Sequence, residues 1–223
     1  KRAFRAWSEK VSGELNILDA GMGFGQYSWF MARMLSNAHI KGVDVKDEQV
    51  ADCNGFFKQV KQENAHFEVA DLTKFKEEEK YDFVLSVDVM EHIEEDVQVF
   101  KNFYASMKPG AMLLISTPSD QGGSDVHHHD HEHEHENDGS HSFIDEHVRD
   151  GYGISEIKDK LAEAGFSRSE AHYSYGAPGK ISWKISMKYP ILMLNASKIF
   201  FVILPFYYLI VFPFMLILNY MDL

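Results

Sequence analysis

Three glycines at alternate positions mark the part of the chain best suited to hold a ligand, in the run Leu18-Asp19-Ala20-Gly21-Met22-Gly23-Phe24-Gly25-Gln26. The apolar residues before them predict a strand over 15–20, and the pattern after them predicts a helix over 27–35. Glycine has no Cβ, so the backbone can turn tightly there and approach a nucleotide-like ligand closely. A glycine-rich loop alone is weak evidence, but the strand and the helix on its two sides provide the required context.

An acidic residue stands 23 residues beyond Gly21. Ile40–Asp44 predicts a second strand that ends in this acid, and a carboxylate at a strand tip can accept both ribose hydroxyls of an adenosine. This interpretation is favoured over a solvated acid because loop, spacing and acid agree. The loop reads G-x-G-x-G, whereas a dinucleotide fingerprint reads G-x-G-x-x-G. The shorter loop leaves less room for a pyrophosphate and suits a smaller adenosine ligand.

Four motifs in this chain resemble those of the class I S-adenosylmethionine-dependent methyltransferases, in the type-11-like form of the ubiquinone-pathway enzymes. The glycine run resembles their motif I, and Ala70-Asp71-Leu72 resembles their adenine-contact motif. Tyr81–Ile93 resembles their strand-four motif, and Met107–Ser116 resembles their turn into strand five. The resemblance covers roughly residues 1–188 and is specific for fold and cofactor, but much less specific for the substrate.

The resemblance implies a site for S-adenosyl-L-methionine. The three glycines would line its methionine and ribose portions, Asp19 would orient the ammonium side, and Asp44 would take the ribose hydroxyls. Asp71 would accept from the adenine amino group, and Leu72 would offer its backbone N–H. Residues 86–88 would face the methionine end. The implied cofactor-binding residues are Asp19, Gly21, Gly23, Gly25, Asp44, Asp71, Leu72, Ser86 and Asp88.

The candidate catalytic residues are His147, His92 and Tyr152. His147 belongs to a stretch that resembles the "H-x-R-x-x-[YF]" segment across the cleft mouth in relatives, and a neutral imidazole suits deprotonation of a hydroxyl near pH 7. Arg149 would bind an anionic group of the substrate, and Tyr152 would pack on or hydrogen-bond it. The alternative is that these residues only pin the segment. His92 either faces the ligand or helps to start the next helix.

Alternating strand and helix patterns continue to Ser116. Strands are expected at 15–20, 39–45, 66–70, 81–88 and 111–117, with helices at 27–35, 47–61, 94–107 and 155–164. A final hairpin is expected from 167–175 and 181–187, because Ile181, Trp183, Ile185 and Met187 alternate with polar residues. The whole predicts an α/β fold with a doubly wound, mostly parallel seven-stranded sheet.

The predicted methyltransferase domain, residues 1–188, contains an acidic, histidine-rich loop at 120–141. Residues 120–150 hold ten acids and one base, and the run 127–136 is largely histidine and glutamate. Such side chains can bind Zn²⁺ or another transition metal. An acidic loop with adventitious metal affinity is the favoured interpretation, and no metal site is assigned.

The remaining residues, 189–223, form a hydrophobic helical tail. Ile199–Leu218 is twenty residues without charge, about the thickness of a bilayer's hydrocarbon core. Lys184, Lys188 and Lys198 precede it, which predicts a domain on the cytoplasmic face of the membrane. Pro205 and Pro213 argue against one straight helix, so spanning and interfacial arrangements both remain open.

The sequence therefore predicts an enzyme that methylates a lipid-like or otherwise hydrophobic acceptor at the membrane. One alternative is a metal-handling or binding protein on a methyltransferase scaffold. Another is a soluble small-molecule methyltransferase whose tail dimerises. Cys53 is the only cysteine, so no disulfide forms within the chain. No basic stripe with interleaved aromatic residues points to nucleic acid, although the net charge of −12 hides a basic tail.

Overall fold

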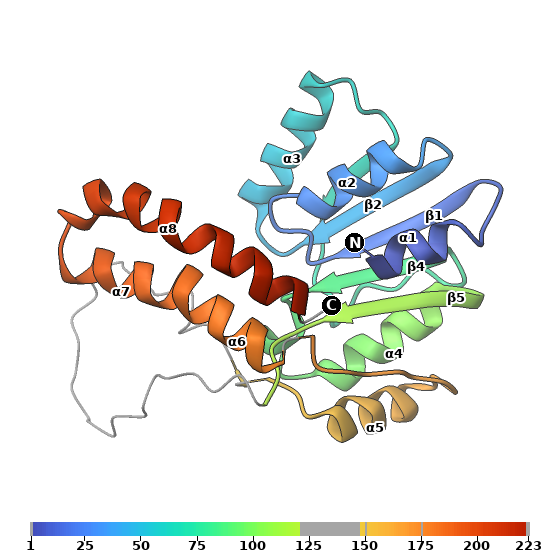
Figure 1. The fold of residues 1–223 in the computed structure, drawn as a ribbon. Helices are drawn as coiled ribbons and strands as arrows, with labels where there is room; N and C mark the ends of the chain where they lie inside the picture. The colour runs from blue at the N-terminus through green and yellow to red at the C-terminus, as the bar shows by residue number, and fades with distance from the viewer. Residues whose placement is uncertain (1, 121–147, 150, 175, 222–223) are drawn as a thin grey trace, which may run out of the picture. The chain divides into compact units, whose positions relative to one another are not determined.

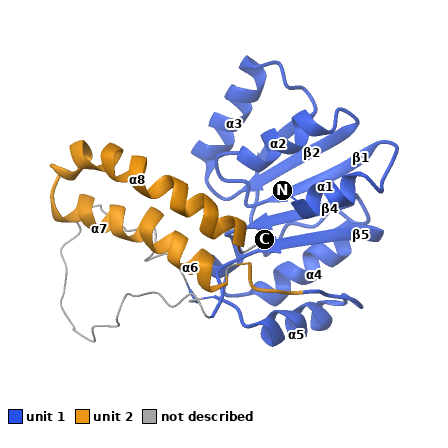
Figure 2. Ribbon diagram, viewed as in Figure 1, with its two compact units in different colours: residues 1–170 blue, residues 171–223 orange. Residues whose placement is uncertain are grey.

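The computed structural model describes residues 2–120, 148–149, 151–174 and 176–221 (Figure 1). The chain divides into two compact units, residues 1–170 and residues 171–223 (Figure 2).

A parallel sheet forms the centre of the first unit. Its strands are β1 (Leu15–Ala20), β2 (Ala38–Asp44), β3 (Ala65–Val69), β4 (Tyr81–Val87) and β5 (Met107–Ser116), in the order β3-β2-β1-β4-β5. All four neighbouring pairs are parallel, so the carboxyl ends of the strands share one edge. The strand order reverses between β1 and β4, which is where ligands bind in open sheets of this kind.

Helices cover both faces of the sheet, as the near-continuous apolar strands require. On one face lie α1 (Arg2–Ser8), α2 (Gln26–Met34) and α3 (Asp47–Gln59), whose buried side chains pack with Ile17 and Phe83. On the other lie α4 (Asp96–Ser106) and α5 (Ile154–Ala164), which pack with Leu18 and Val84. A short 3₁₀ helix, η1 (Met90–His92), follows β4. Figure 1 shows the two helical layers on opposite sides of the strands.

The expected sheet of seven strands is wrong for the described residues, which form a sheet of five. The hairpin expected at 167–175 and 181–187 is absent from them, because Ala177–Trp183 is the helix α6. The residues between the two expected strands, 176–180, are instead the start of this helix. Gly176 is its N-cap, and Pro178 lies in the first turn, where its missing N–H is not needed. The alternating pattern of Ile181 and Trp183 was misleading because both side chains are half exposed.

The second unit is helical. α6 runs through a π-helical turn, η2 (Lys184–Lys188), into α7 (Tyr189–Ala196), and α8 (Phe200–Met221) packs on α6 and η2. Pro205 and Pro213 argue against one straight helix, yet both lie inside α8 and neither ends it, so the apolar run forms a single helix. A proline removes one intrahelical hydrogen bond, but its φ fits a helix, and long apolar helices tolerate the loss.

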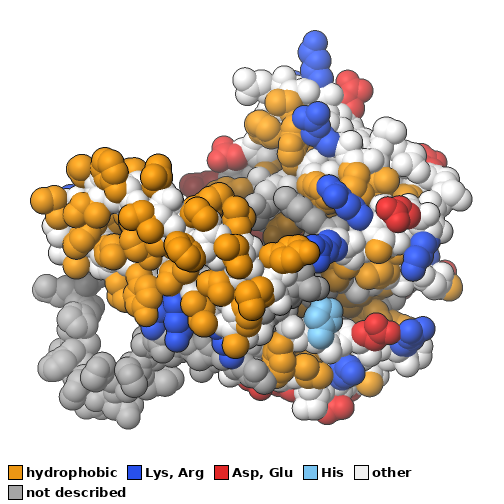
Figure 3. All heavy atoms as spheres, in the orientation of Figure 1, with side chains coloured by type: hydrophobic (Ala, Val, Ile, Leu, Met, Phe, Trp, Pro, Cys, Tyr) orange, Lys and Arg blue, Asp and Glu red, His pale blue; other side chains and the backbone are white. Residues whose placement is uncertain are grey.

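α8 is long and apolar enough to cross a membrane, and within the described residues no other helix is. Only 6% of its most apolar window is buried, which distinguishes it from the core helix of a soluble domain. Figure 3 shows hydrophobic side chains across the visible surface of this unit. The structure thus contains one exposed apolar helix near the C-terminus, as the sequence predicts.

Candidate cofactor site

The glycine turn joins β1 to α2 at the carboxyl edge of the sheet. All three of its glycines have positive φ, 72° at Gly21, 52° at Gly23 and 69° at Gly25, a region that residues with a Cβ rarely adopt. A Cβ on Gly21 would lie 2.3 Å from Cγ2 of Val89, and one on Gly25 would lie 2.9 Å from Sγ of Cys53. These two glycines are therefore fixed by both backbone conformation and close packing.

The turn is also tied to β2. The backbone N–H groups of Gly21 and Met22 donate to the carbonyl of Val43 over 2.8 and 3.1 Å. The carboxylate of Asp44 accepts from the N–H of Gly23 at 2.9 Å and from the N–H of Lys46 at 3.0 Å. Each oxygen of this carboxylate then keeps one lone pair, enough for two hydroxyl donors. The predicted pairing of glycine turn and Asp44 is thus present as a direct contact.

Asp19 lies beneath the turn and is buried. The hydroxyl of Ser28, on α2, donates to its Oδ2 over 2.6 Å. Burial raises the pKa of Asp19 to about 6, although the hydrogen bond from Ser28 opposes the rise. A buried carboxylate that is hydrogen-bonded by Ser28 still attracts positive charge, which fits the predicted role toward an ammonium group through the loop.

Asp71 follows β3 at the same edge and closes a local turn. Its Oδ1 accepts from the N–H and hydroxyl of Thr73 at 2.9 and 2.7 Å, and its Oδ2 pairs with Lys74 at 3.1 Å. Hydrogen bonds from Thr73, followed by Lys74, lower the pKa of Asp71. The side chain of Leu72 is buried, and its carbonyl accepts from Nδ2 of Asn102 at 2.8 Å. These contacts hold the backbone of the predicted adenine-contact segment in place.

Residues 86–88 end β4 beside β1. Ser86 pairs with Ala20 and Ile115 and is buried, and its hydroxyl has no hydrogen-bond partner among the described residues. Asp88 has a positive φ of 53°, which Asp tolerates better than most residues, and its N–H donates to Ser116. The predicted methionine-end residues therefore stand at the β1–β4 switch point, as expected for a ligand there.

The Glu91–His92 pair lies in η1. Glu91 is the buried member: Thr117 donates to its Oε2 at 3.1 Å, and burial raises the pKa of its carboxyl group. The backbone N–H of His92 donates to the carbonyl of Val89. The side chain of Val89 in turn packs against Gly21. The segment that carries His92 therefore packs on the glycine turn, and both predicted roles of His92, at the helix start and in ligand contact, remain compatible with this position.

Arg149 and Tyr152 converge on Asp96, at the start of α4. The hydroxyl of Tyr152 donates to Oδ2 of Asp96 at 2.8 Å and to the carbonyl of Met90 at 3.1 Å. Arg149 pairs with the same carboxylate and donates to the carbonyl of Ile93 at 2.6 Å. Lys160 of α5 adds an ion pair at 2.6 Å. These contacts favour the alternative that the two residues pin the segment before α5.

Asp96 stays ionised at the centre of this cluster. Burial opposes its ionisation, but hydrogen bonds from Lys160 and Tyr152 and the charge of Arg149 together hold its pKa below the ordinary value. Tyr152 is buried, and burial together with Asp96 raises the pKa of its hydroxyl. A phenol in this position donates a hydrogen bond and does not accept a proton from a substrate.

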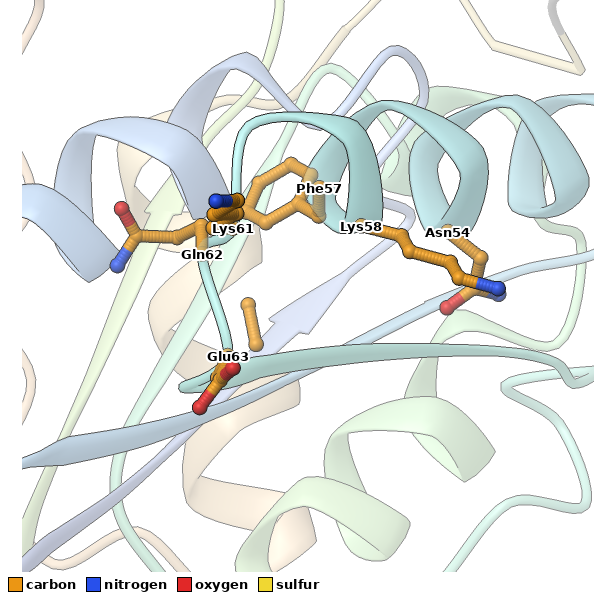
Figure 4. Close-up of a pocket in the computed structure, with 7 residues that line it drawn as sticks. Asn54, Phe57, Lys58, Lys61, Gln62 and Glu63 are labelled. Atoms are coloured by element: carbon orange, nitrogen blue, oxygen red, sulfur yellow. The ribbon is translucent and has the colours of Figure 1, made fainter.

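His147 and the histidine-rich run 127–136 lie outside the described residues. Within the residues that the structure describes, no group of three or more His, Cys, Asp or Glu side chains could hold a metal ion. A surface hollow is lined by Asn54, Phe57, Lys58, Lys61, Gln62, Glu63 and Ala65 (Figure 4). Because Ala65 begins β3 and Asp71 follows its end, this hollow lies at the opposite edge from the glycine turn.

The residues present fit an adenosine-containing cationic cofactor. The turn offers close backbone approach, the Asp44 carboxylate has acceptor capacity left, and the Ser86 hydroxyl is unused among the described residues. Sequence reasoning missed four residues that support this arrangement: Ser28, Val89, Cys53 and Asp96. Ser28, Cys53 and Asp96 belong to no motif, and Val89 lies in the strand-four motif, but each supports the site through a contact made only in the folded chain.

The methyltransferase domain family matches this chain over residues 12–165. The chain is 29% identical over 110 residues to a malonyl-[acyl-carrier protein] O-methyltransferase from Ilyobacter polytropus, covering 49% of this chain and 40% of that protein. It is 27% identical over 103 residues to a ubiquinone biosynthesis O-methyltransferase from Coxiella burnetii, covering 46% of this chain and 43% of that protein.

Among solved structures, phosphoethanolamine N-methyltransferase 2 from Haemonchus contortus, in complex with S-adenosyl-L-methionine, matches with a TM-score of 0.57. The match covers 74% of this chain and 36% of that one at 19% identity, so it shows the shared fold. The chain spans less than half the length of the curated relatives named above. With the family match, the parallel sheet and the glycine turn in agreement, the chain belongs to the methyltransferase domain family, of the class I S-adenosylmethionine-dependent type.

Proposed function

We propose that this protein transfers a methyl group from S-adenosyl-L-methionine to a lipid-like or otherwise hydrophobic acceptor at a membrane. The observation that carries the cofactor half is the contact between Asp44 and the N–H of Gly23. It joins an acid at the tip of β2 to a turn of three left-handed glycines at the switch point of the sheet. A ribose bound there would meet the remaining lone pairs of the carboxylate.

The bound cofactor supplies a methyl group already activated on a sulfonium, so the protein's main task is positioning. Asp44 holds the ribose, Gly21 and Gly25 allow close approach of the backbone, and buried Asp19 attracts the ammonium side. Asp71 and Leu72 present the adenine contacts from a turn fixed by Thr73 and Asn102. Ser86 and Asp88 border the methionine end.

A base is needed where the acceptor is a hydroxyl. His147 remains the proposed base, with His92 as the second candidate. Arg149 and Tyr152 position this region through Asp96, since the guanidinium and the phenol are both engaged there. In this assignment they orient the segment that carries His147 and do not bind the acceptor directly.

Three features support a hydrophobic acceptor. α8 is an exposed apolar helix of membrane-spanning length. Phe24, at the tip of the glycine turn, is 85% exposed. The relatives include a protein named for ubiquinone biosynthesis. The lysines before α8 support a position of the catalytic unit on the cytoplasmic side in this proposal.

The test combines two measurements on the full chain. Isothermal titration should show binding of S-adenosyl-L-methionine and S-adenosylhomocysteine, and radiolabelled methyl should pass from the cofactor into a total membrane-lipid extract. Lack of cofactor binding would overturn the proposal that this protein is a methyltransferase. Cofactor binding with label entering only water-soluble acceptors would favour the soluble enzyme with a dimerising tail. Binding of Zn²⁺ without binding of cofactor would favour the metal-handling alternative.

A further inference from the structure

We propose that the helices of the second unit form a hairpin that lies in the plane of a membrane's interface, on anionic lipid, and does not cross the bilayer. The inference rests on the membrane half of the proposed function and decides between the two arrangements that the sequence leaves open. Its basis is the fixed register between α8 and the helix formed by α6, η2 and α7.

Two tyrosines of α8 set that register. The hydroxyl of Tyr207 donates to the carbonyl of Ile185 at 2.6 Å, and the hydroxyl of Tyr208 donates to the carbonyl of Ser186 at 2.7 Å. Both carbonyls belong to the π-helical turn η2. The two contacts are adjacent on each helix, so they hold α8 beside η2 at one position along its length.

Pro190 explains why these carbonyls take side-chain donors. In an α-helix the carbonyl of Ser186 would accept from the N–H of residue 190, and proline has none. The carbonyl of Ile185 would accept from Tyr189, but that N–H donates to Lys184 within the π-helical turn. In apolar surroundings an unpaired carbonyl is costly, so the tyrosine contacts keep the two helices together within a lipid phase.

With this register fixed, the lysines extend along the length of the hairpin. Lys180, Lys184 and Lys188 repeat every four residues and so lie along one side of the helix. Lys198 stands in the turn before α8. Ala196, where α7 ends, lies sixteen residues after Lys180, about 24 Å of helix, which is most of the hydrocarbon thickness.

A spanning arrangement would bury part of this row. Because Tyr208 lies at Ser186 and the helices run in opposite directions, Lys184 is level with the middle of α8. If α8 crossed the bilayer with its partner attached, that ammonium would lie near the bilayer centre, where a charge is costly. In a hairpin that lies flat, all four lysines reach the headgroup layer and meet anionic lipid.

The exposed side chains of α8 supply the apolar contact with the membrane. Large ones are more than half exposed along its whole length: Phe201, Phe206, Leu209, Phe212, Phe214 and Tyr220. Figure 3 shows lysine or arginine side chains at the border of the hydrophobic surface of this unit. An apolar surface bordered by basic side chains is the pattern of an interfacial segment.

The experiment adds the full chain to preformed vesicles of phosphatidylcholine with phosphatidylglycerol. Single cysteines replace Ser197 and Asn219, at the two ends of α8, in a Cys53→Ala background. A membrane-impermeant maleimide should label both cysteines in intact vesicles. Labelling of only one end until detergent is added would show that α8 spans the bilayer and would overturn the inference.

A charge series tests the lipid. The triple variant Lys180→Gln, Lys184→Gln, Lys188→Gln should bind these vesicles at least tenfold more weakly. The matched control Lys10→Gln, Lys58→Gln, Lys76→Gln, with the same change in charge on the first unit, should bind like the parent. Equal binding by the two triple variants would overturn the role of the lysine row. No binding of the parent to vesicles would overturn the membrane half of the proposed function as well, whereas cofactor titration reports on the enzyme separately.

Discussion

Asp44 connects the two halves of the cofactor site, since one carboxylate organises the glycine turn and keeps acceptors for a ligand. We expect Asp44→Ala to weaken binding of S-adenosylhomocysteine at least tenfold, about 1.4 kcal/mol, because two charge-assisted hydrogen bonds to the ligand are lost. Isothermal titration measures the change. Asp52→Ala, which removes an exposed acid of α3, should leave the affinity unaltered. Equal affinity of Asp44→Ala and the parent would remove Asp44 from the site.

Glycine to alanine substitutions at Gly21 and Gly55 should change the free energy of unfolding in opposite directions. Gly21 has φ 72°, and an added Cβ would meet Val89 at 2.3 Å, so Gly21→Ala should lower the free energy of unfolding by about 1–2 kcal/mol. Gly55 lies in α3 with nothing within 4 Å of an added Cβ, so Gly55→Ala should raise it by about 0.5–1 kcal/mol. Urea unfolding distinguishes the two, and a neutral Gly21→Ala would contradict the close packing.

The buried Asp19 carboxyl should make stability depend on pH. Its folded pKa of about 6 exceeds the ordinary 3.8, so the folded state binds the proton more tightly. This stabilisation is complete below about pH 3.8 and is lost as the pH rises through about 6. Relative to Asp19→Asn, the parent should therefore lose roughly 3 kcal/mol across that window in the absence of cofactor.

Urea unfolding of the parent and Asp19→Asn between pH 4 and pH 7 provides the measurement. Ser28→Ala removes the donor that opposes the shift, so its transition should move to higher pH than that of the parent. Parallel stability curves for the parent and Asp19→Asn would show that the carboxyl titrates alike in the folded and unfolded chain.

At the scale of elements, η2 and α8 depend on each other through Pro190. Pro190→Ala returns an N–H donor to the carbonyl of Ser186, so the hydroxyl of Tyr208 should lose its importance. We expect Tyr208→Phe to lower the thermal stability of the second unit in the parent and to have little effect in Pro190→Ala. A double-mutant cycle followed by circular dichroism in detergent gives this coupling. Additive effects of the two substitutions would show that Pro190 and the Tyr208 hydrogen bond are not coupled.

The elements of the first unit were largely predictable, because each has a strong local signal. The apolar runs of β1, β4 and β5 and the periodic helices between them fall within a few residues of their predicted limits. α6 was not predictable in the same way. Its alternating apolar residues match a strand, but among the described residues this segment is a helix and pairs with no strand. The start at Gly176 and Pro178 was the available signal, but it serves turns and helix ends alike.

The site was predictable where a motif fixes the backbone and less so where a contact gives a residue its role. The roles of Gly21 and Asp44 were predictable because the glycine run and the spacing to the acid are visible in the sequence. Asp96 does not, because its partners Arg149 and Lys160 stand more than fifty residues further along the chain. For the same reason the sequence could not show that Tyr152 donates to Asp96.

For the whole molecule, the division at Glu170 predicts an independent catalytic unit. The sheet, both core clusters and the glycine turn all lie within residues 1–170. A chain that ends after Glu170 should therefore stay in solution without detergent and bind S-adenosylhomocysteine like the full chain. It should methylate a bilayer-resident acceptor poorly. Cofactor titration and vesicle assays measure both, and loss of cofactor binding would show that the second unit completes the site.

Backbone hydrogen bonds join the segment after β5 to the segment before α5, and this connection has an evolutionary consequence. The N–H of Tyr152 donates to the carbonyl of Pro118 at 3.0 Å, and the N–H of Asp120 donates back to Tyr152 at 3.2 Å. The backbone at Ser119 and the backbone at Tyr152 are therefore direct neighbours. Since the entropy cost of closing a loop grows only slowly with length, lineages could gain or lose residues between Asp120 and His147 with little cost to the stability of the fold. Such a place is where a family of enzymes is expected to acquire new sequences fastest, and where a reporter could be inserted by design.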